Sequence, residues 1–121
     1  MGIVTLTLPA HAEYVAIARS VAAGIAAKAS MTLDDIEDVR LAVDEACAHL
    51  LSSTSSERLT LEVSRDEGLL QIAARVDGAI DAVPANDDGA IAWRSLETLA
   101  DSVRLERDGT SAVIRMAKRI A

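Results

Sequence analysis

The sequence predicts an α+β fold of the two-layer sandwich type, with three helices on one face of a mostly antiparallel sheet. Apolar residues alternate with polar ones in five short segments and recur at helical spacing in three longer ones. The order strand, helix, helix, strand, strand, helix, strand, strand favours separate layers of helices and strands. Because the chain has 121 residues and no linker rich in Pro, Gly or Ser, we expect residues 1–121 to form a single domain.

The N-terminal segment predicts a strand followed by a helix. Residues 3–8 alternate between apolar and polar side chains, as a half-buried strand does, and Pro9 closes the run. From residue 12 to about residue 29, apolar side chains recur at helical spacing. This helix leaves Glu13 and Arg19 directed toward solvent or toward a partner.

Residues 32 to about 51 predict a second helix that has two apolar faces. Thr32 followed by Asp35 resembles a capping box at its start. One face forms a core stripe, and Glu45 and His49 lie on the other, one turn apart, where both can act on the same small volume. From the spacing alone, they are either an exposed helical pair or a site in which the carboxylate orients a hydroxyl group and the imidazole carries a proton or holds a metal ion.

The C-terminal half predicts two hairpins separated by a loop and a helix. Within residues 58–76, apolar and polar side chains alternate on both sides of a turn at residues 66–68. Residues 77–89 are rich in Asp, Gly and Asn and have no sustained period, which predicts a loop. Helical spacing returns from residue 91 to about residue 100, and residues 103–117 form the last hairpin. The uncovered face of the sheet is then either solvated or a dimer contact.

Composition excludes several classes of function. Nineteen acidic and twelve basic residues give a net charge of -7, which repels phosphate backbones, so we expect no direct contact with nucleic acid. The single cysteine, Cys47, lies in an apolar helical stretch, which indicates a buried side chain rather than a reactive thiol. Trp93 at helical spacing indicates core or dimer packing. No apolar stretch is long enough to span a membrane, so we expect a cytoplasmic protein without membrane contact.

A family resemblance is carried by three segments that span nearly the whole chain: LPAHAEYVAIARS, LDDIEDVRLAVDEAC and WRSLETLADSVRLERDGTSAVIRM. Together they resemble the RsbW-type anti-sigma factor serine-protein kinases of the histidine kinase and Hsp90-like ATPase superfamily. The resemblance implies a homodimer that binds and silences an alternative, stress-response type sigma factor. It also implies release by an unphosphorylated anti-anti-sigma factor, which the kinase phosphorylates on serine with ATP and magnesium.

The same resemblance implies a nucleotide site whose residues depart from the family pattern. Glu45 matches the glutamate that helps to orient the attacking hydroxyl group. His49 stands where the family has the asparagine that ligates magnesium, and magnesium prefers oxygen ligands. The element that reads adenine matches Gly78, but Val76 then occupies the aspartate position, with Asp77 one residue away.

Two further elements bear on the same nucleotide site. The glycine-rich box begins at Gly89 and reads GAIAW, and alanine in place of glycine disfavours the positive φ angles that bring backbone amides close to phosphate. The lid segment between Gly78 and Gly89 is shorter than in the family. Gly109 and Thr110 keep the final Gly-Thr motif of the family. These departures predict that binding of ATP or ADP with magnesium is weak or lost.

The partner-binding positions match the family better. Arg19 matches an arginine that in the family faces the sigma factor and the antagonist, and Glu13 and Tyr14 are its neighbours. Taken alone, Arg19 is equally explained as a solvated helix charge. We therefore predict an anti-sigma factor that acts chiefly by binding. Two alternatives remain open, a working serine-protein kinase that uses Glu45 and an interaction module whose partner is not a sigma factor.

Overall fold

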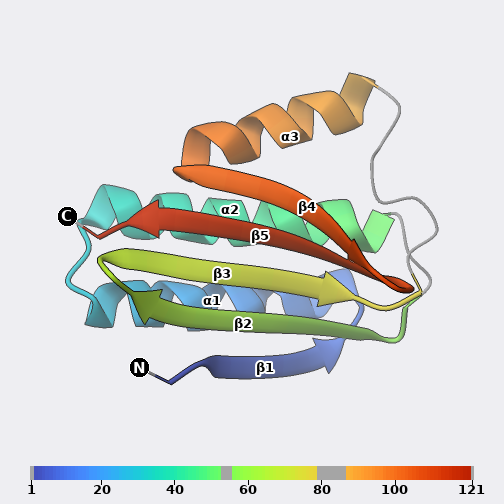
Figure 1. The fold of residues 1–121 in the computed structure, drawn as a ribbon, viewed down its shortest axis with the longest axis horizontal. Coiled ribbons are helices and arrows are strands. Elements are labelled where there is room, and N and C mark those ends of the chain that lie inside the picture. Colours follow the sequence, from blue (N-terminus) through green and yellow to red (C-terminus); the bar gives the residue numbers. More distant parts are fainter. Residues whose placement is uncertain (1, 53–55, 79–86, 121) are drawn as a thin grey trace.

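A five-stranded antiparallel sheet forms the fold, with two helices behind it and a third beside one of its edge strands, as Figure 1 shows. The structure is a computed structural model and describes residues 2–52, 56–78 and 87–120. The predicted α+β class and the predicted order of elements are confirmed. The elements are β1 (Val4–Pro9), α1 (Ala12–Lys28), α2 (Leu33–Ser52), β2 (Arg58–Asp66), β3 (Leu69–Val76), α3 (Asp87–Leu99), β4 (Ser102–Asp108) and β5 (Ser111–Arg119).

The strands follow the order β1-β2-β3-β5-β4, and every neighbouring pair is antiparallel. Two hairpins, β2–β3 and β4–β5, meet at the central β3–β5 pair, where Val76 lies opposite Ala112. This register places the C-terminal end of β3 beside the turn that leads into β5. The ends of segments distant in the sequence therefore meet at one end of the sheet.

The core lies between the sheet and the helical hairpin formed by α1 and α2. The side of α1 that faces the sheet carries small side chains, because Ala18, Ala22 and Ala26 are all 0% exposed. The backbone of α1 can therefore lie close to the strands. Branched side chains of α2 and of the strands fill the remaining space, among them Val43 and Leu61.

The start of α2 is capped as the sequence predicts. The Thr32 Oγ1 atom accepts a hydrogen bond of 3.1 Å from the backbone N–H of Asp35. This bond satisfies one of the amides that the first turn of a helix leaves without an intrahelical partner. The cap fixes the direction in which α2 leaves the turn after α1, and so orients the two faces of α2.

Two predicted boundaries are wrong by a few residues. The helix α3 begins at Asp87 rather than at residue 91, so Gly89 lies in its first turn instead of in a loop. The periodicity was carried by large apolar residues, and the run DDGA contains none of them. The strand β1 ends with Pro9, which pairs with Arg58. The predicted lid residues 79–86 lie outside the described residues.

Among the helices of the described segments, none has both the length and the apolar character that crossing a membrane requires.

Candidate functional site

The residues matched to a nucleotide site gather at one end of the molecule. The C-terminal ends of α2 and β3 and the turn between β4 and β5 lie at the same end, on the right in Figure 1. Thr110 is exposed in that turn. The Ser111 hydroxyl group donates a hydrogen bond of 2.6 Å to Asp77 Oδ1. This bond ties the end of β3 to the beginning of β5.

Asp77 and Gly78 form the exit from β3. The backbone N–H of Asp77 donates a hydrogen bond of 3.3 Å to Ser56 Oγ. Gly78 has a φ angle of 68°, a left-handed conformation in which any side chain would be strained. The Asp77 carboxylate, the candidate for reading adenine, already accepts the hydrogen bond from Ser111.

The side chain of His49, on α2, is buried where α3 packs against that helix. Its side chain is 5% exposed, and the centroids of the His49 and Trp93 rings are 5.8 Å apart, with the ring planes tilted by 56°. The reading of Glu45 and His49 as an exposed pair is therefore wrong for His49, because α3 covers that face of α2. The prediction of Trp93 as a packing residue is confirmed, since it lies against the core beside fully buried Leu96.

Glu45 borders a different space from the one that His49 fills. A groove between the N-terminal part of α1 and the C-terminal half of α2 has a volume of about 440 Å³. We call it the α1–α2 groove, and its lining residues are Ala12, Val15, Asp44, Glu45, Ala48, Leu51 and Ser52. Most of its lining is apolar, and two carboxylates stand along it. The groove is therefore suited to an apolar side chain of a bound protein segment that carries a basic side chain next to it.

Arg19 is held beside this groove by an ion pair. Its Nη1 atom donates a hydrogen bond of 2.9 Å to Oδ1 of Asp44, and the two side chains are 36% and 43% exposed. Arg19 is therefore oriented by α2 and is not a freely solvated charge. Glu13 is exposed, and Tyr14 is half-buried against the core. All three predicted partner residues thus lie on α1, which forms one wall of the α1–α2 groove.

The chemistry of His49 bears on the expected magnesium site. The resemblance puts His49 at the position of a magnesium ligand, but its imidazole is not the oxygen ligand that magnesium prefers, and the ring packs on Trp93. Within residues 2–52, 56–78 and 87–120, no group of three or more His, Cys, Asp or Glu residues is placed to hold a metal ion.

Cys47 is excluded as a nucleophile. Its side chain is 0% exposed, and burial, helped by the nearby Asp44 charge, raises the pKa of its thiol to about 12. The thiolate, which is the reactive form, is therefore absent at neutral pH. The prediction of a buried cysteine is confirmed.

Sequence comparison finds proteins named RsbW. The chain is 31% identical over 109 residues to the anti-sigma-F factor RsbW of Mycobacterium tuberculosis H37Rv, which covers 88% of this chain and 62% of that protein. It is 31% identical over 130 residues to the serine-protein kinase RsbW of Bacillus licheniformis, covering 91% of this chain and 81% of that protein. A Bacillus cereus serine-protein kinase RsbW is 36% identical over 78 residues, and the chain spans 49% of its length. No family model matches the chain.

Solved structures show the same fold. The structure of joined RsbU and RsbW domains from Mycobacterium tuberculosis superposes with a TM-score of 0.77 at 13% identity, over 99% of this chain and 33% of that chain. A histidine kinase domain from the blue-light activated histidine kinase of Erythrobacter litoralis superposes with a TM-score of 0.59 at 16% identity, over 93% of this chain and 62% of that chain.

Proposed function

The chain belongs to the RsbW family, since it is 31% identical to a member of which it covers 81%, and we propose that it is an anti-sigma factor that binds and sequesters an alternative, stress-response type sigma factor. The observation that carries this proposal is a sequence alignment, in which 88% of the chain matches a protein named as an anti-sigma-F factor. The chain spans only 62% of that relative, so its activity is argued from its own residues below.

The α1–α2 groove is the surface we assign to the sigma factor. Its apolar wall, which includes Leu51, accepts an apolar side chain, and Glu45 is placed to pair with a basic one. One exposed apolar side chain, Leu41 at 44%, lies one helical turn before Glu45 and extends the apolar surface along α2. A net charge of -7 favours the approach of a basic segment of the partner.

Binding rather than catalysis is the proposed activity, with nucleotide affinity weak or lost. Protein kinases use a nucleotide held by magnesium through oxygen ligands. The proposal is supported by His49, which the resemblance puts at the corresponding position and whose imidazole is buried. Release of the sigma factor is then controlled by a protein antagonist, an anti-anti-sigma factor, that competes for the α1–α2 groove. We also propose that the chain assembles as a homodimer.

A serine-protein kinase is the second candidate function. It is favoured by Glu45, which is half-exposed on the groove where the hydroxyl group of a bound partner would lie. Calorimetric titration with ATP and ADP, with and without magnesium, separates the two candidates. Affinity weaker than about 1 mM, near -4 kcal/mol, supports the binding role. Magnesium-dependent binding, together with transfer of labelled phosphate that Glu45→Ala abolishes, supports the kinase instead.

Replacement of Arg19 tests the assigned surface. Arg19→Glu replaces the guanidinium group that lies 2.9 Å from Asp44 Oδ1 by a carboxylate. It should weaken binding of a purified alternative sigma factor from the same organism at least tenfold. Arg94→Glu is the matched control, because Arg94 is an exposed arginine on α3. Titration calorimetry gives the Kd of each variant. An unchanged Kd for Arg19→Glu, or an equal loss for Arg94→Glu, contradicts the assigned surface.

If no alternative sigma factor binds the wild-type protein, the anti-sigma proposal itself fails. Reproducible binding of a different protein, lost in Arg19→Glu and kept in Arg94→Glu, would then identify the chain as an interaction module for another partner.

A further inference from the structure

The α1–α2 groove ends at an ion pair that joins its two walls. Arg19 lies on α1 and Asp44 on α2, 25 positions apart in the sequence, and Arg19 Nη1 donates a hydrogen bond of 2.9 Å to Asp44 Oδ1. The other lining residues of the groove lie on one side of this pair, before position 19 on α1 and after position 44 on α2. The ion pair therefore bridges the two helices at one end of the groove.

The position of this bridge limits the length of the groove. A helix rises about 1.5 Å per residue, so the stretch of α1 from Ala12 to Arg19 spans about 10 Å. A space of that length holds about two turns of a helix or about three residues of extended chain. Leu41, which is exposed, lies beyond the bridge on α2. The bridge therefore separates a short apolar contact in the groove from the apolar surface at Leu41.

The ion pair also sets the charge of the groove. Asp44 and Glu45 are adjacent carboxylates in its lining, and Arg19 compensates the charge of Asp44. Glu45 is half-exposed and makes no hydrogen bond or ion pair with any residue that the structure describes. With Arg19 in place, Glu45 is the uncompensated charge of the groove. Without Arg19, two uncompensated carboxylates would stand side by side.

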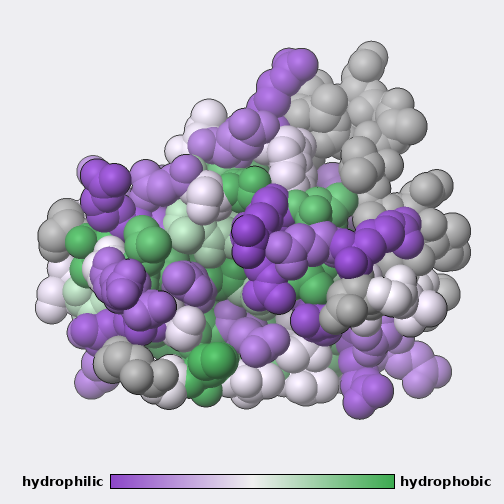
Figure 2. Space-filling model, viewed as in Figure 1, coloured by the Kyte–Doolittle hydropathy of each residue, from purple (hydrophilic) through white to green (hydrophobic). Residues whose placement is uncertain are grey.

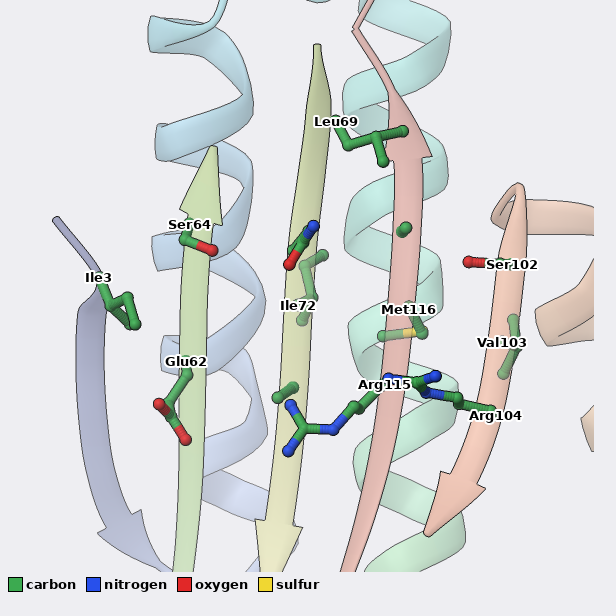
Figure 3. A pocket seen from close by; sticks show the side chains of 13 residues that line it. Ile3, Glu62, Ser64, Leu69, Ile72, Ser102, Val103, Arg104, Arg115 and Met116 are labelled. Atoms are coloured by element: carbon green, nitrogen blue, oxygen red, sulfur yellow. The ribbon is translucent and has the colours of Figure 1, made fainter. Parts of the chain in front are cut away.

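Two arginines of the sheet lie away from the groove. Figure 3 shows Arg104 on β4 and Arg115 on β5 at a hollow of about 480 Å³, with helices behind the strands. The Nε atoms of both arginines lie 2.8 Å from Glu106. Figure 2, which looks onto this face of the sheet, shows hydrophilic side chains spread across it with hydrophobic ones between them. The sheet separates these guanidinium groups from α1 and α2, so they do not compensate Glu45.

The contact with Asp44 prepares Arg19 for a partner. A guanidinium group has several N–H donors, and the hydrogen bond to Asp44 uses one of them. The Arg19 side chain is 36% exposed, so other donors can reach a bound protein. A long side chain loses conformational freedom when a partner orders it, and this loss weakens binding. Because Asp44 already restricts Arg19 in the free protein, less freedom remains to be lost when the partner binds.

We propose that Asp44 is a positioning residue for partner binding, which holds the Arg19 guanidinium group across the end of the α1–α2 groove and leaves Glu45 as the charge that the partner meets. The partner segment that fits has a short apolar contact and one basic side chain beside it, rather than two. This inference rests on the proposed function, because it assigns a role within the surface given there to the sigma factor.

A double-mutant cycle of Asp44 and Arg19 tests the positioning role. Titration calorimetry measures the Kd of the full chain for a purified alternative sigma factor from the same organism, at about 0.3 M salt to screen long-range attraction. Asp44→Ala should weaken binding about fivefold. In the Arg19→Met background, the same change should alter the Kd less than about twofold, because no guanidinium group is left to position. Asp44→Glu keeps a carboxylate on the same turn and should keep the Kd within about twofold of the wild type.

Glu37→Ala is the matched control. Glu37 is a carboxylate on the same helix that lies 3.9 Å from the Nε atom of Arg40, and it is not part of the groove lining. This variant should leave the Kd within about twofold of the wild type. Partly exposed ion pairs contribute little to stability, so all the variants should fold, and circular dichroism checks this.

The outcomes separate the positioning role from the proposed function. An equal loss on Asp44→Ala in both backgrounds would show that Asp44 acts on the partner directly, and it would overturn the positioning role. Unchanged or tighter binding by Asp44→Ala, or an equal loss in Glu37→Ala, would overturn it as well. In each of these cases the wild-type protein still binds, and the proposed function stands. A wild-type protein that binds no alternative sigma factor overturns the proposed function and the positioning role together.

Discussion

Replacement of Lys118 by methionine should lower the free energy of unfolding by about 2 kcal/mol. The Lys118 Nζ atom donates a hydrogen bond of 3.0 Å to the carbonyl oxygen of Leu99. It also lies 3.4 Å from Asp38 Oδ2 and 3.7 Å from Asp35 Oδ1, and the Lys118 side chain is only 14% exposed. One ammonium group thus joins β5 to the end of α3 and to the first half of α2.

The magnitude follows from the contacts that are lost. A hydrogen bond to a charged group contributes about 1.5–3 kcal/mol. The two aspartates are 30% and 38% exposed, so solvent screens both ion pairs, and together they add less than about 1 kcal/mol. Methionine keeps part of the apolar stem of lysine, which offsets some of the loss. At about 2.1 cal/mol/K per residue, a loss of about 2 kcal/mol lowers the Tm of a chain of this size by about 8 °C.

Thermal unfolding followed by circular dichroism measures the effect. The sequence offers a matched control, because its only other lysine, Lys28, is exposed at the end of α1. Lys28→Met should change the free energy of unfolding by less than about 0.5 kcal/mol. Equal Tm values for the two variants would refute the reasoning that Lys118 holds the three elements together.

Two further predictions concern titration. Cys47 should resist thiol reagents at pH 8 until the protein unfolds, and rapid labelling of the native protein would contradict this prediction. Folding raises the pKa of the Cys47 thiol from 9.0 to about 12. The unfolded state therefore loses this proton first, and the free energy of unfolding should fall as the pH rises above about 9. The hydrogen bond from Arg115 lowers the pKa of Glu106 below its ordinary value of 4.5, so this bond should persist at pH 4.5 and contribute stability that is lost as the pH falls through the lowered pKa. Titration of the Glu106 carboxyl carbon by NMR checks the second prediction, and a midpoint at or above 4.5 would contradict it.

Sequence periodicity predicted the fold because most elements of this chain follow their local pattern. The residues of β2 and β3 alternate between the core and the sheet face opposite α1 and α2, and the Thr32 cap forms where the spacing of Thr32 and Asp35 places it. The start of α3 was missed because residues 87–90 include no large apolar side chain from which a period can be read.

The candidate site was predicted less well because it depends on which element covers which face. The spacing of Glu45 and His49 correctly puts them one turn apart, but only the packing of α3 decides that His49 is buried. The second apolar face of α2 was the available signal, since such a face needs a partner helix. Nothing in the sequence indicates the Arg19–Asp44 ion pair, which joins residues 25 positions apart on different helices. The roles of Glu13, Tyr14 and Arg19 in partner binding stay predictions.

The strand order also bears on how the chain folds. The hairpins β2–β3 and β4–β5 close over short turns, whereas pairing Val4 with Val63 closes a loop of 59 residues that includes both α1 and α2. Long loops cost more entropy to close, so non-local pairings form late. Because β1 lies at an edge and pairs with β2 alone among the described strands, we expect it to join the sheet last and to detach first. Local opening should therefore begin at the N-terminal edge and leave the central hairpins intact.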